Sequence, residues 1–460
     1  MNFGHVRHLH FLGVGGVGMC GLAELLHGEG FTVSGCDLAA SETTARLDSL
    51  GIRVDLGHAA GHLKGVQVLV ISSAVKADNT EVEAARRLGI PVIRRAEMLG
   101  ELSRLKWGIA VAGTHGKTTT TSLTGFVLTQ AGLDPTVVVG GRMHFLGAHA
   151  RLGRSEYLVC EADEFDRSFL ALFPVLALLT TVEAEHLDTY GSVEAMEDAF
   201  VTFANRVPFY GATIACLDDA GVRRLLPRLE RRIVTYGFSP QADVHGRAVR
   251  LSDIGCSCQV VLCGHEIGEL RLPLPGRHML VNALGATAAA LEVGVSFTTI
   301  ASAVGAFTGV ARRFERKGQR NGVVLVDDYA HHPVEIQATL NAAKDGFGRR
   351  VIAVFQPHRY SRTQALLGEF STAFYQADRL FVTEIYPAGE APIPGVSGRQ
   401  IADGVAGHGH RHVTYVADKS ELAKAVLDQV APGDMVLTLG AGDVWRVGEE
   451  ILDRLRAGGR

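Results

Sequence analysis

Long apolar runs and a secretory signal are both missing from this sequence. No uninterrupted apolar stretch among its 460 residues reaches the roughly 18 residues of a membrane-spanning helix. Residues 1–10 lack the charged-then-apolar pattern of a signal peptide. We therefore expect a cytoplasmic protein that has no membrane partner.

Cysteine is scarce, and charge of either sign is not in excess. The seven cysteines are scattered along the chain, which argues against a disulfide framework and favours a reducing compartment. The 45 basic and 49 acidic side chains give a net charge of −4, without the clustered lysines and arginines of a nucleic-acid-binding surface.

Cys256, Cys258 and Cys263 also lack the paired C-x-x-C spacing of structural zinc sites. We expect no nucleic-acid partner, and we expect Cys256 and Cys258 to pack as small apolar residues.

Glycine, in contrast, is abundant, and its 54 residues suit an α/β fold with many tight turns between strands and helices. Short apolar stretches such as 157–161, 351–355 and 435–439 alternate with helical patterns, which predicts buried strands in mostly parallel sheets. The length exceeds one ordinary core. We predict three α/β domains: an N-terminal Rossmann-like domain at 1–105, a central P-loop domain at 106–316 and a C-terminal Rossmann-like, doubly wound domain at 317–460. Residues 317–321 are predicted to form a polar turn.

A first nucleotide site is predicted at residues 13–18, whose sequence G-V-G-G-V-G matches G-x-G-x-x-G between a predicted strand and a helix. Its glycines allow a tight turn and let a phosphate approach the helix N-terminus. Asp37, at the end of the next strand, is placed to accept hydrogen bonds from ribose hydroxyls. The pattern indicates a diphosphate ligand, and it leaves open an NAD-dependent dehydrogenase or a turn that binds nothing.

A second nucleotide site is predicted at residues 113–119, G-T-H-G-K-T-T, a phosphate loop between an apolar strand and a helix. The loop amides can surround phosphate oxygens, Lys117 can reach the β- and γ-phosphates, and the Thr118 hydroxyl can bind Mg²⁺. Val111 stands where the usual pattern has a glycine, so the loop is a short variant. The alternative is an ordinary helix N-terminus that carries a lysine.

Acidic residues follow the next two predicted strands and are candidate metal ligands. Glu161 ends one strand, and Glu183, Glu185, His186 and Asp188 follow the other. A carboxylate at a strand end beside a phosphate loop is well placed to hold the cation that phosphoryl transfer needs. A solvated acidic turn is the alternative, and the strand-end positions favour function for Glu161 and His186.

Together these motifs resemble the Mur ligases over nearly the whole chain. The resemblance rests on HFLGVGGVGMCGLA at 10–23, GTHGKTTTT at 113–121, EADEFDRSF at 161–169, HLDTY at 186–190, ARRFE at 311–315, DDYAHHPVEI at 327–336, QPHRYSRT at 356–363 and GAGDV at 440–444. His115 in the loop and the His331–His332 pair resemble the alanine-adding branch of the family.

The resemblance implies an ATP- and Mg²⁺-dependent ligase whose substrates are UDP-N-acetylmuramate and L-alanine. The N-terminal domain would bind the uridine substrate, the central domain ATP, and the C-terminal domain would close over both. An acyl phosphate would form on the muramate carboxylate, and the alanine amine would then displace phosphate. Such chemistry depends on positioning and charge neutralisation, which agrees with a sequence that has no obvious Ser-His or Cys-His nucleophile motif. We expect a monomer or a weak homodimer.

The resemblance also assigns individual residues. Lys117, Glu161 and His186 would be catalytic, with Thr118, Glu161 and His186 as metal ligands. ATP contacts would come from Gly113, Thr114, His115, Gly116, Lys117, Thr118, Thr119, Asn282, Arg313 and Asp328. Substrate contacts would come from Gly15, Gly16, Val17, Gly18, Asp37, Ser73, His331, His358 and Arg359.

Two departures from the family pattern lie beside His186. Thr181 stands where the family usually has asparagine, and Ala184–Glu185 where it usually has Pro-Asp. The second-metal ligands are therefore less well defined by the resemblance. Two other classes stay open: an NAD-dependent oxidoreductase fused to a nucleotide-binding module, and a non-enzymatic ATP-gated binding protein.

Overall fold

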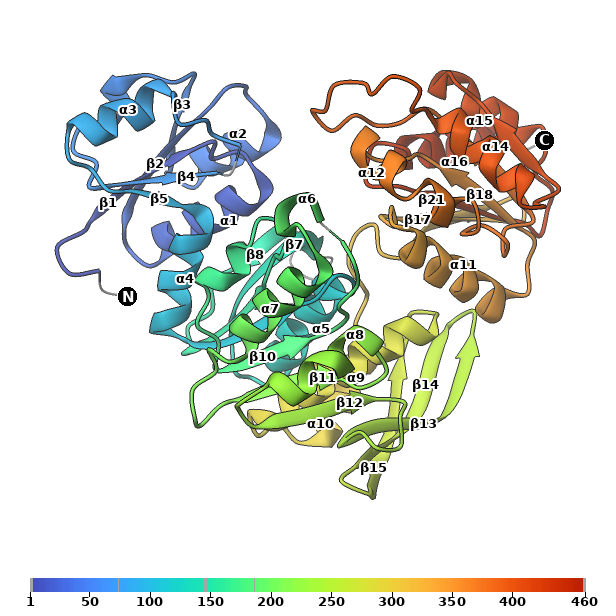
Figure 1. The fold of residues 1–460 in the computed structure, drawn as a ribbon, viewed down its shortest axis with the longest axis horizontal. Coiled ribbons are helices and arrows are strands. Elements are labelled where there is room, and N and C mark those ends of the chain that lie inside the picture. The colour runs from blue at the N-terminus through green and yellow to red at the C-terminus, as the bar shows by residue number, and fades with distance from the viewer. Residues whose placement is uncertain (1–2, 73, 144–147, 186, 458–460) are drawn as a thin grey trace. The chain divides into compact units, whose positions relative to one another are not determined.

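The computed structural model describes residues 3–72, 74–143, 148–185 and 187–457, which form three β-sheets with helices packed on them (Figure 1). The α/β fold class predicted from the sequence is confirmed. The chain divides into two compact units. One contains the first sheet and most of the second, and the other contains the third sheet.

The first sheet is parallel, with strand order β3-β2-β1-β4-β5. Its strands are β1 (His8–Leu12), β2 (Thr32–Asp37), β3 (Arg53–Leu56), β4 (Val68–Ile71) and β5 (Val92–Arg94). Its helices are α1 (Val17–Gly28), α2 (Glu42–Ser49), η1 (Ala60–Leu63), α3 (Thr80–Arg87) and α4 (Arg95–Leu105). Side-chain caps fix two of the helix starts: Ser41 caps α2 and Asn79 caps α3.

The second sheet has ten strands in the order β15-β14-β13-β12-β11-β10-β6-β9-β7-β8. The strands are β6 (Trp107–Ala112), β7 (Thr136–Met143), β8 (Ala148–Arg151), β9 (Tyr157–Glu161), β10 (Leu176–Leu179), β11 (Ala212–Cys216), β12 (Ile233–Gly237), β13 (Val244–Ser252), β14 (Gly255–Leu262) and β15 (His265–Leu272). The helices are α5 (Lys117–Gln130), η2 (Ser168–Ala171), α6 (Leu187–Tyr190), α7 (Val193–Ala204), α8 (Ala220–Leu225), η3 (Leu226–Arg228), α9 (Arg277–Glu292) and α10 (Phe297–Gly305).

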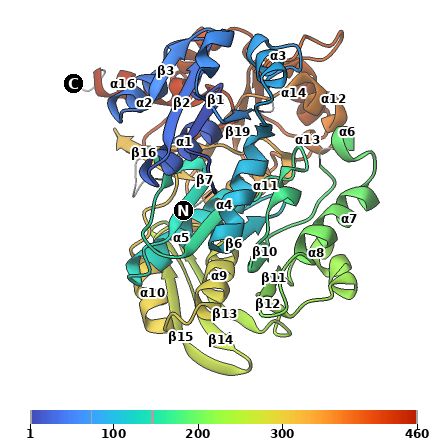
Figure 2. The ribbon, with the colours of Figure 1, turned by 90° about the vertical axis from the view of Figure 1, so that its left-hand side faces the viewer.

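The first two sheets share one hydrophobic core, because helices of the first domain pack directly on the second sheet. Helix α1 contacts β7 and β8, and α4 contacts β6 and η2. Figure 2 shows α1 near β7 and α4 near β6. The approach is close: a Cβ atom on Gly21 would lie 2.9 Å from that of Ala150. The glycine turn and the phosphate loop therefore belong to one packed unit.

The third sheet has the order β16-β17-β21-β18-β19-β20. Its strands are β16 (Glu315–Arg320), β17 (Val323–Asp328), β18 (Val351–Phe355), β19 (Arg379–Val382), β20 (Val413–Tyr415) and β21 (Met435–Leu439). Its helices are α11 (Pro333–Phe347), α12 (Tyr360–Ala365), α13 (Leu367–Phe370), α14 (Gly398–Gly407), α15 (Lys419–Leu427) and α16 (Trp445–Ala457). All pairs are parallel except β16 with β17, which are antiparallel.

The prediction of a polar turn at 317–321 was wrong. Most of this segment belongs to β16, which pairs with β17 through a register shift between Arg316 and Gly318. As an edge strand it has little apolar surface to bury, so its polar sequence does not reveal the strand. Its main chain is hydrogen-bonded to β17 and so belongs to the third sheet.

All seven cysteines are free thiols, as the sequence indicated, and Cys256 and Cys258 are buried. Among the residues that the structure describes, no helix is long and apolar enough to cross a membrane.

Candidate active site

The phosphate loop lies where three parallel strands of the second sheet end side by side. Strand β6 leads into the loop, and its neighbours β9 and β10 end at the same edge. Gly113 and Gly116 have positive φ angles of 140° and 80°. A Cβ atom would lie 2.1 Å from Thr180 Oγ1 at the first position and 2.6 Å from Asn282 Oδ1 at the second. Only glycine fits at either place, and the second contact brings the buried Asn282 of α9 directly against the loop.

Lys117, the first residue of α5, is anchored by both the loop and an acidic residue. Its Nζ donates to the carbonyl oxygens of Gly113 at 2.6 Å and Thr114 at 3.1 Å, and to Glu164 Oε1 at 2.8 Å. Burial would lower the pKa of Lys117, but the carboxylates, Glu164 foremost, outweigh it and hold the pKa above its usual range. The lysine therefore carries a fixed positive charge. Burial raises the pKa of Glu164 to about 7.

The next residue of the loop faces Glu161 at the end of β9. Thr118 Oγ1 donates to Glu161 Oε1 at 3.1 Å, and the Gly140 amide donates to Glu161 Oε2 at 2.8 Å. A hydroxyl oxygen beside a half-buried carboxylate is a donor set that suits Mg²⁺, which takes few protein oxygens and completes its shell with phosphate and water. The residues present thus fit the cation that phosphoryl transfer requires. Thr119, the following residue, is buried in α5.

Thr181, one of the departures from the family pattern, supports the loop. Its Oγ1 accepts from the His115 amide at 2.8 Å, and its carbonyl oxygen accepts from the Thr114 amide at 2.9 Å. The Thr114 hydroxyl in turn accepts from the Glu183 amide at 2.9 Å. The end of β10 and the loop therefore hold each other in place. His186 and Ser73, both predicted as site residues, lie outside the described residues.

The glycine turn of the first domain is closed by Asp37. The amides of Gly13 and Val14 donate to the Cys36 carbonyl at 2.9 and 3.0 Å, and the Gly15 amide donates to Asp37 Oδ2 at 2.8 Å. A Cβ atom on Gly15 would lie 2.8 Å from that same oxygen. Gly16 caps α1, whose first two residues are Val17 and Gly18. The structure thus brings the predicted turn residues and Asp37 together, with the carboxylate bonded to the main chain of the turn.

Arg95 lies over the turn, and the sequence analysis missed it. A Cβ atom on Gly18 would lie 3.0 Å from Arg95 Cδ and 3.1 Å from one of its terminal nitrogens. The side chain therefore adds a cation to the N-terminus of α1, where anions bind. Two consecutive arginines directly after a predicted strand, Arg94 and Arg95, were the available signal.

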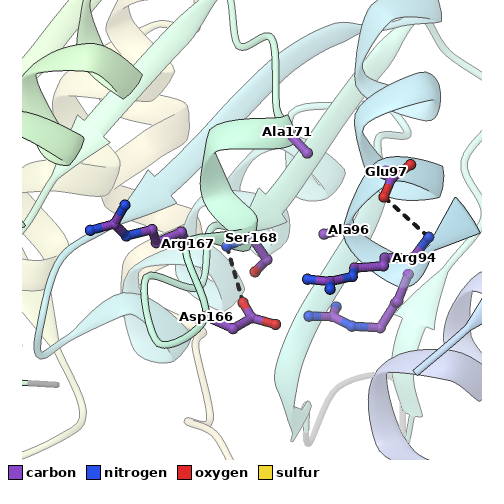
Figure 3. Close-up of a pocket in the computed structure, with 8 residues that line it drawn as sticks. Arg94, Ala96, Glu97, Asp166, Arg167, Ser168 and Ala171 are labelled. Atoms are coloured by element: carbon purple, nitrogen blue, oxygen red, sulfur yellow. Dashed lines mark hydrogen bonds between the residues drawn. The ribbon is translucent and has the colours of Figure 1, made fainter. Parts of the chain in front are cut away.

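A pocket of about 170 Å³ adjoins these arginines (Figure 3). One side is formed by residues 94–97 and the other by 166–168 and Ala171. The Asp166 carboxylate accepts a hydrogen bond from the Ser168 amide at 3.0 Å, and the Glu97 carboxylate accepts one from the Arg94 amide at 3.4 Å. Both bonds are drawn in Figure 3. The pocket therefore lies between the start of α4 and the segment that follows β9.

In the other unit, Asp328 ends β17 and is buried. Its Oδ2 accepts from the Phe314 amide and its Oδ1 from the Ala330 amide, both at 2.7 Å. Burial raises the pKa of Asp328 to about 6, and Arg313 opposes the shift. Arg313 also lies 3.6 Å from Glu335. Arg313 and Asp328, both predicted to contact ATP, are therefore neighbours within this unit.

His331, His358 and Arg359 also lie close together in this unit. The His331 and His358 rings are 5.8 Å apart, and His358 stacks on Tyr386 at 5.6 Å. Burial, helped by the positive charges of His331, Arg362 and Arg359, lowers the pKa of His358 to about 3. Arg359 has a φ of 70°, unusual for a residue with a side chain, and its amide donates to the Tyr386 carbonyl at 2.9 Å. Such local strain is typical of functional loops.

Comparison with known proteins gives the same family along the whole chain. The Mur ligase family catalytic domain matches residues 8–107, the Mur ligase middle domain 111–290, and the Mur ligase glutamate ligase domain 312–442. The UDP-N-acetylmuramate--L-alanine ligase of Solidesulfovibrio magneticus is 53% identical over 98% of this chain and 99% of its own length. The enzyme of the same name from Syntrophotalea carbinolica is 52% identical over 99% of both chains.

Solved structures agree with these relatives. The UDP-N-acetylmuramate-alanine ligase of Thermotoga maritima has a TM-score of 0.82 and 29% identity, covering 99% of this chain and 100% of its own. A murein peptide ligase from Psychrobacter arcticus has a TM-score of 0.70 and 25% identity, covering 98% of both chains. The chain therefore belongs to the Mur ligase family.

Proposed function

We propose that this chain is an ATP-dependent ligase that joins L-alanine to UDP-N-acetylmuramate in cytoplasmic peptidoglycan precursor synthesis. One observation carries the proposal: a phosphate loop in which Lys117 is paired with the buried Glu164, while the next residue, Thr118, donates to Glu161. This arrangement suits phosphoryl transfer and offers nothing to a hydride-transfer reaction. Relatives that carry this name match the chain from end to end.

The proposed reaction has two chemical steps. The muramate carboxylate oxygen attacks the γ-phosphorus of ATP, so that ADP leaves and an acyl phosphate forms. The alanine amine then attacks the acyl carbon, loses a proton and expels phosphate, which leaves an amide. Lys117 would hold the γ-phosphate and offset the charge that develops during transfer.

Thr118 and Glu161 would hold Mg²⁺, which would neutralise the negative charges of the phosphates. Glu161 is already oriented by the Gly140 amide, so it needs little rearrangement to bind a cation. Glu164 would keep the ammonium of Lys117 in position before the nucleotide binds. The Gly116 amide and the adjacent Asn282 side chain would complete the phosphate-binding loop.

The glycine turn would bind the diphosphate of the uridine substrate rather than a nicotinamide cofactor. Asp37 would act by holding the Gly15 amide in the turn, and Arg95 would add a charge-assisted contact to the diphosphate.

Ligand-induced stabilisation tests this assignment. UDP-N-acetylmuramate should raise the melting temperature, because it binds the native state, whereas NAD and NADP at equal concentration should not. Asp37→Ala should lower the affinity for UDP-N-acetylmuramate and leave the affinity for ATP unchanged. Asp48→Ala, an exposed aspartate of α2, is the matched control and should behave as wild type. A shift produced by NAD alone would instead support a dehydrogenase.

Arg359 is proposed to bind the carboxylate of L-alanine, because a guanidinium can meet both oxygens and so fix the approach of the amine. Arg359→Lys keeps the positive charge but replaces the guanidinium, which can bind both carboxylate oxygens, by a single ammonium. The KM for L-alanine should therefore rise at least about tenfold. Affinities for ATP and UDP-N-acetylmuramate should stay near normal. Arg411→Lys, at an exposed position, is the control. A uniform loss of stability and of all three affinities would make Arg359 a structural residue.

A further inference from the structure

The first domain contains a buried polar cluster that the proposed reaction does not use. It consists of His10 on β1, Cys36 on β2, His62 on η1 and Glu81 on α3, with His58 at its edge. His10 and Glu81 are fully buried, while the side chains of His58 and His62 are 18% and 15% exposed. The cluster thus has a closed interior and an opening toward solvent on its histidine side.

Glu81 is the centre of this cluster. Its Oε1 accepts from His62 Nδ1 at 2.9 Å, from the Ala59 amide at 3.0 Å and from Cys36 Sγ at 3.2 Å. These three contacts surround one oxygen of a carboxylate whose side chain has no exposure to solvent. A buried negative charge persists only where cations or several hydrogen-bond donors surround it.

The second oxygen of Glu81 is different. Oε2 lies 3.2 Å from His10 Nε2, within ion-pair distance, and neither atom makes a hydrogen bond that satisfies the other side of its bonding capacity among the described residues. The His10 ring is fixed from its other side, because Nδ1 lies 2.8 Å from Ser34 Oγ, which also contacts His8 Nε2 at 2.9 Å. An imidazole held in this way directs its remaining nitrogen at a target, as histidines that bind metals do.

We propose that this cluster is a binding site for one zinc-class divalent ion, with ligands from His10, Cys36, His62 and Glu81. Their four donor atoms lie within 4.8 Å of one another, and a tetrahedral site with bonds of about 2.0–2.3 Å needs only a slight contraction. Two imidazoles, a thiolate and a carboxylate form a set that favours Zn²⁺ over Mg²⁺ or Ca²⁺. Binding would release the thiol proton of Cys36, and the cation would neutralise Glu81.

The position of the site indicates what the ion would stabilise. The Cys36 carbonyl accepts the Gly13 and Val14 amides, and the next residue, Asp37, accepts the Gly15 amide. An ion bound to Cys36 would therefore fix the strand end that holds the glycine turn. This role is separate from the phosphate loop, whose Mg²⁺ ligands are oxygen atoms.

Cobalt substitution tests the proposal in the full chain. The protein is freed of metal with a chelator, dialysed, supplied with excess Mg²⁺ to occupy oxygen sites, and titrated with Co²⁺. We expect one equivalent to bind with thiolate-to-cobalt charge-transfer absorption and strong visible bands of tetrahedral Co²⁺. Zn²⁺ should displace it and raise the melting temperature.

Variants locate the site. Cys36→Ser should abolish the charge-transfer band and the stabilisation by Zn²⁺, and His62→Gln should weaken Co²⁺ binding at least about tenfold. Cys263→Ser removes the exposed thiol and should leave both signals intact. The melting temperature in chelator shows whether each variant is folded. Wild-type protein without a charge-transfer band, or a folded Cys36→Ser that retains it, would show that the cluster is only a hydrogen-bond network.

Discussion

Lys117→Ala should lower turnover by roughly two to four orders of magnitude, the cost of losing a major electrostatic contact to the transferring phosphoryl group. Nζ already lies at the mouth of the loop on the carbonyl oxygens of Gly113 and Thr114, and its pKa is held above the usual range. Steady-state release of phosphate at saturating ATP, UDP-N-acetylmuramate and L-alanine measures the effect. Activity within tenfold of wild type would remove Lys117 from the reaction.

The same substitution should also reduce stability. A lysine at a loop mouth is not expected to matter for folding, but here it is paired with Glu164, which is almost fully buried. Leaving that carboxylate charged and without its partner costs about 3–5 kcal/mol, and less if Glu164 takes up a proton. Lys117→Ala combined with Glu164→Gln should therefore recover the melting temperature without recovering turnover. Lys76→Ala, at an exposed lysine, controls for loss of charge alone.

Glu161→Gln should raise the Mg²⁺ concentration needed for half-maximal activity by at least about tenfold, because the shape is kept while the charge that would hold the cation is lost. The glutamine oxygen can still accept from the Gly140 amide, so the loop should stay folded. A Mg²⁺ titration of phosphate release at fixed ATP measures the shift.

Glu156→Gln is the matched control, since Glu156 is an exposed acid just before the same strand β9. It should titrate with Mg²⁺ like wild type. If Glu161→Gln does so too, the cation is held elsewhere, and the acidic residues after β10 become the next candidates.

The central parallel strands could be predicted because they are short apolar runs that are buried on both faces. Strands β9, β18 and β21 have the predicted bounds, 157–161, 351–355 and 435–439. Edge strands were harder: β8 and β16 contain charged residues and bury little, so nothing in their sequence separates them from loops.

The candidate site was predictable where one local motif contains both the backbone geometry and the chemistry. Residues 113–119 are such a motif, because the glycines that the turn requires lie next to the lysine and the threonine. Arg95 and Glu164 were missed because their roles arise from packing between segments far apart in the sequence: Arg95 lies on Gly18, and Glu164 pairs with Lys117. The cluster of His10, Cys36, His62 and Glu81 was missed for the same reason, since its residues come from four separate elements.

Phosphate release with each substrate omitted in turn tests the central claim most directly. With ATP and Mg²⁺ present, the account predicts sustained release of phosphate only when both UDP-N-acetylmuramate and L-alanine are added, with one amide product formed per phosphate. Without L-alanine, release should be limited to slow hydrolysis of the acyl phosphate. Sustained release that needs neither substrate, or ATP consumption without an amide product, would contradict the assignment as a ligase.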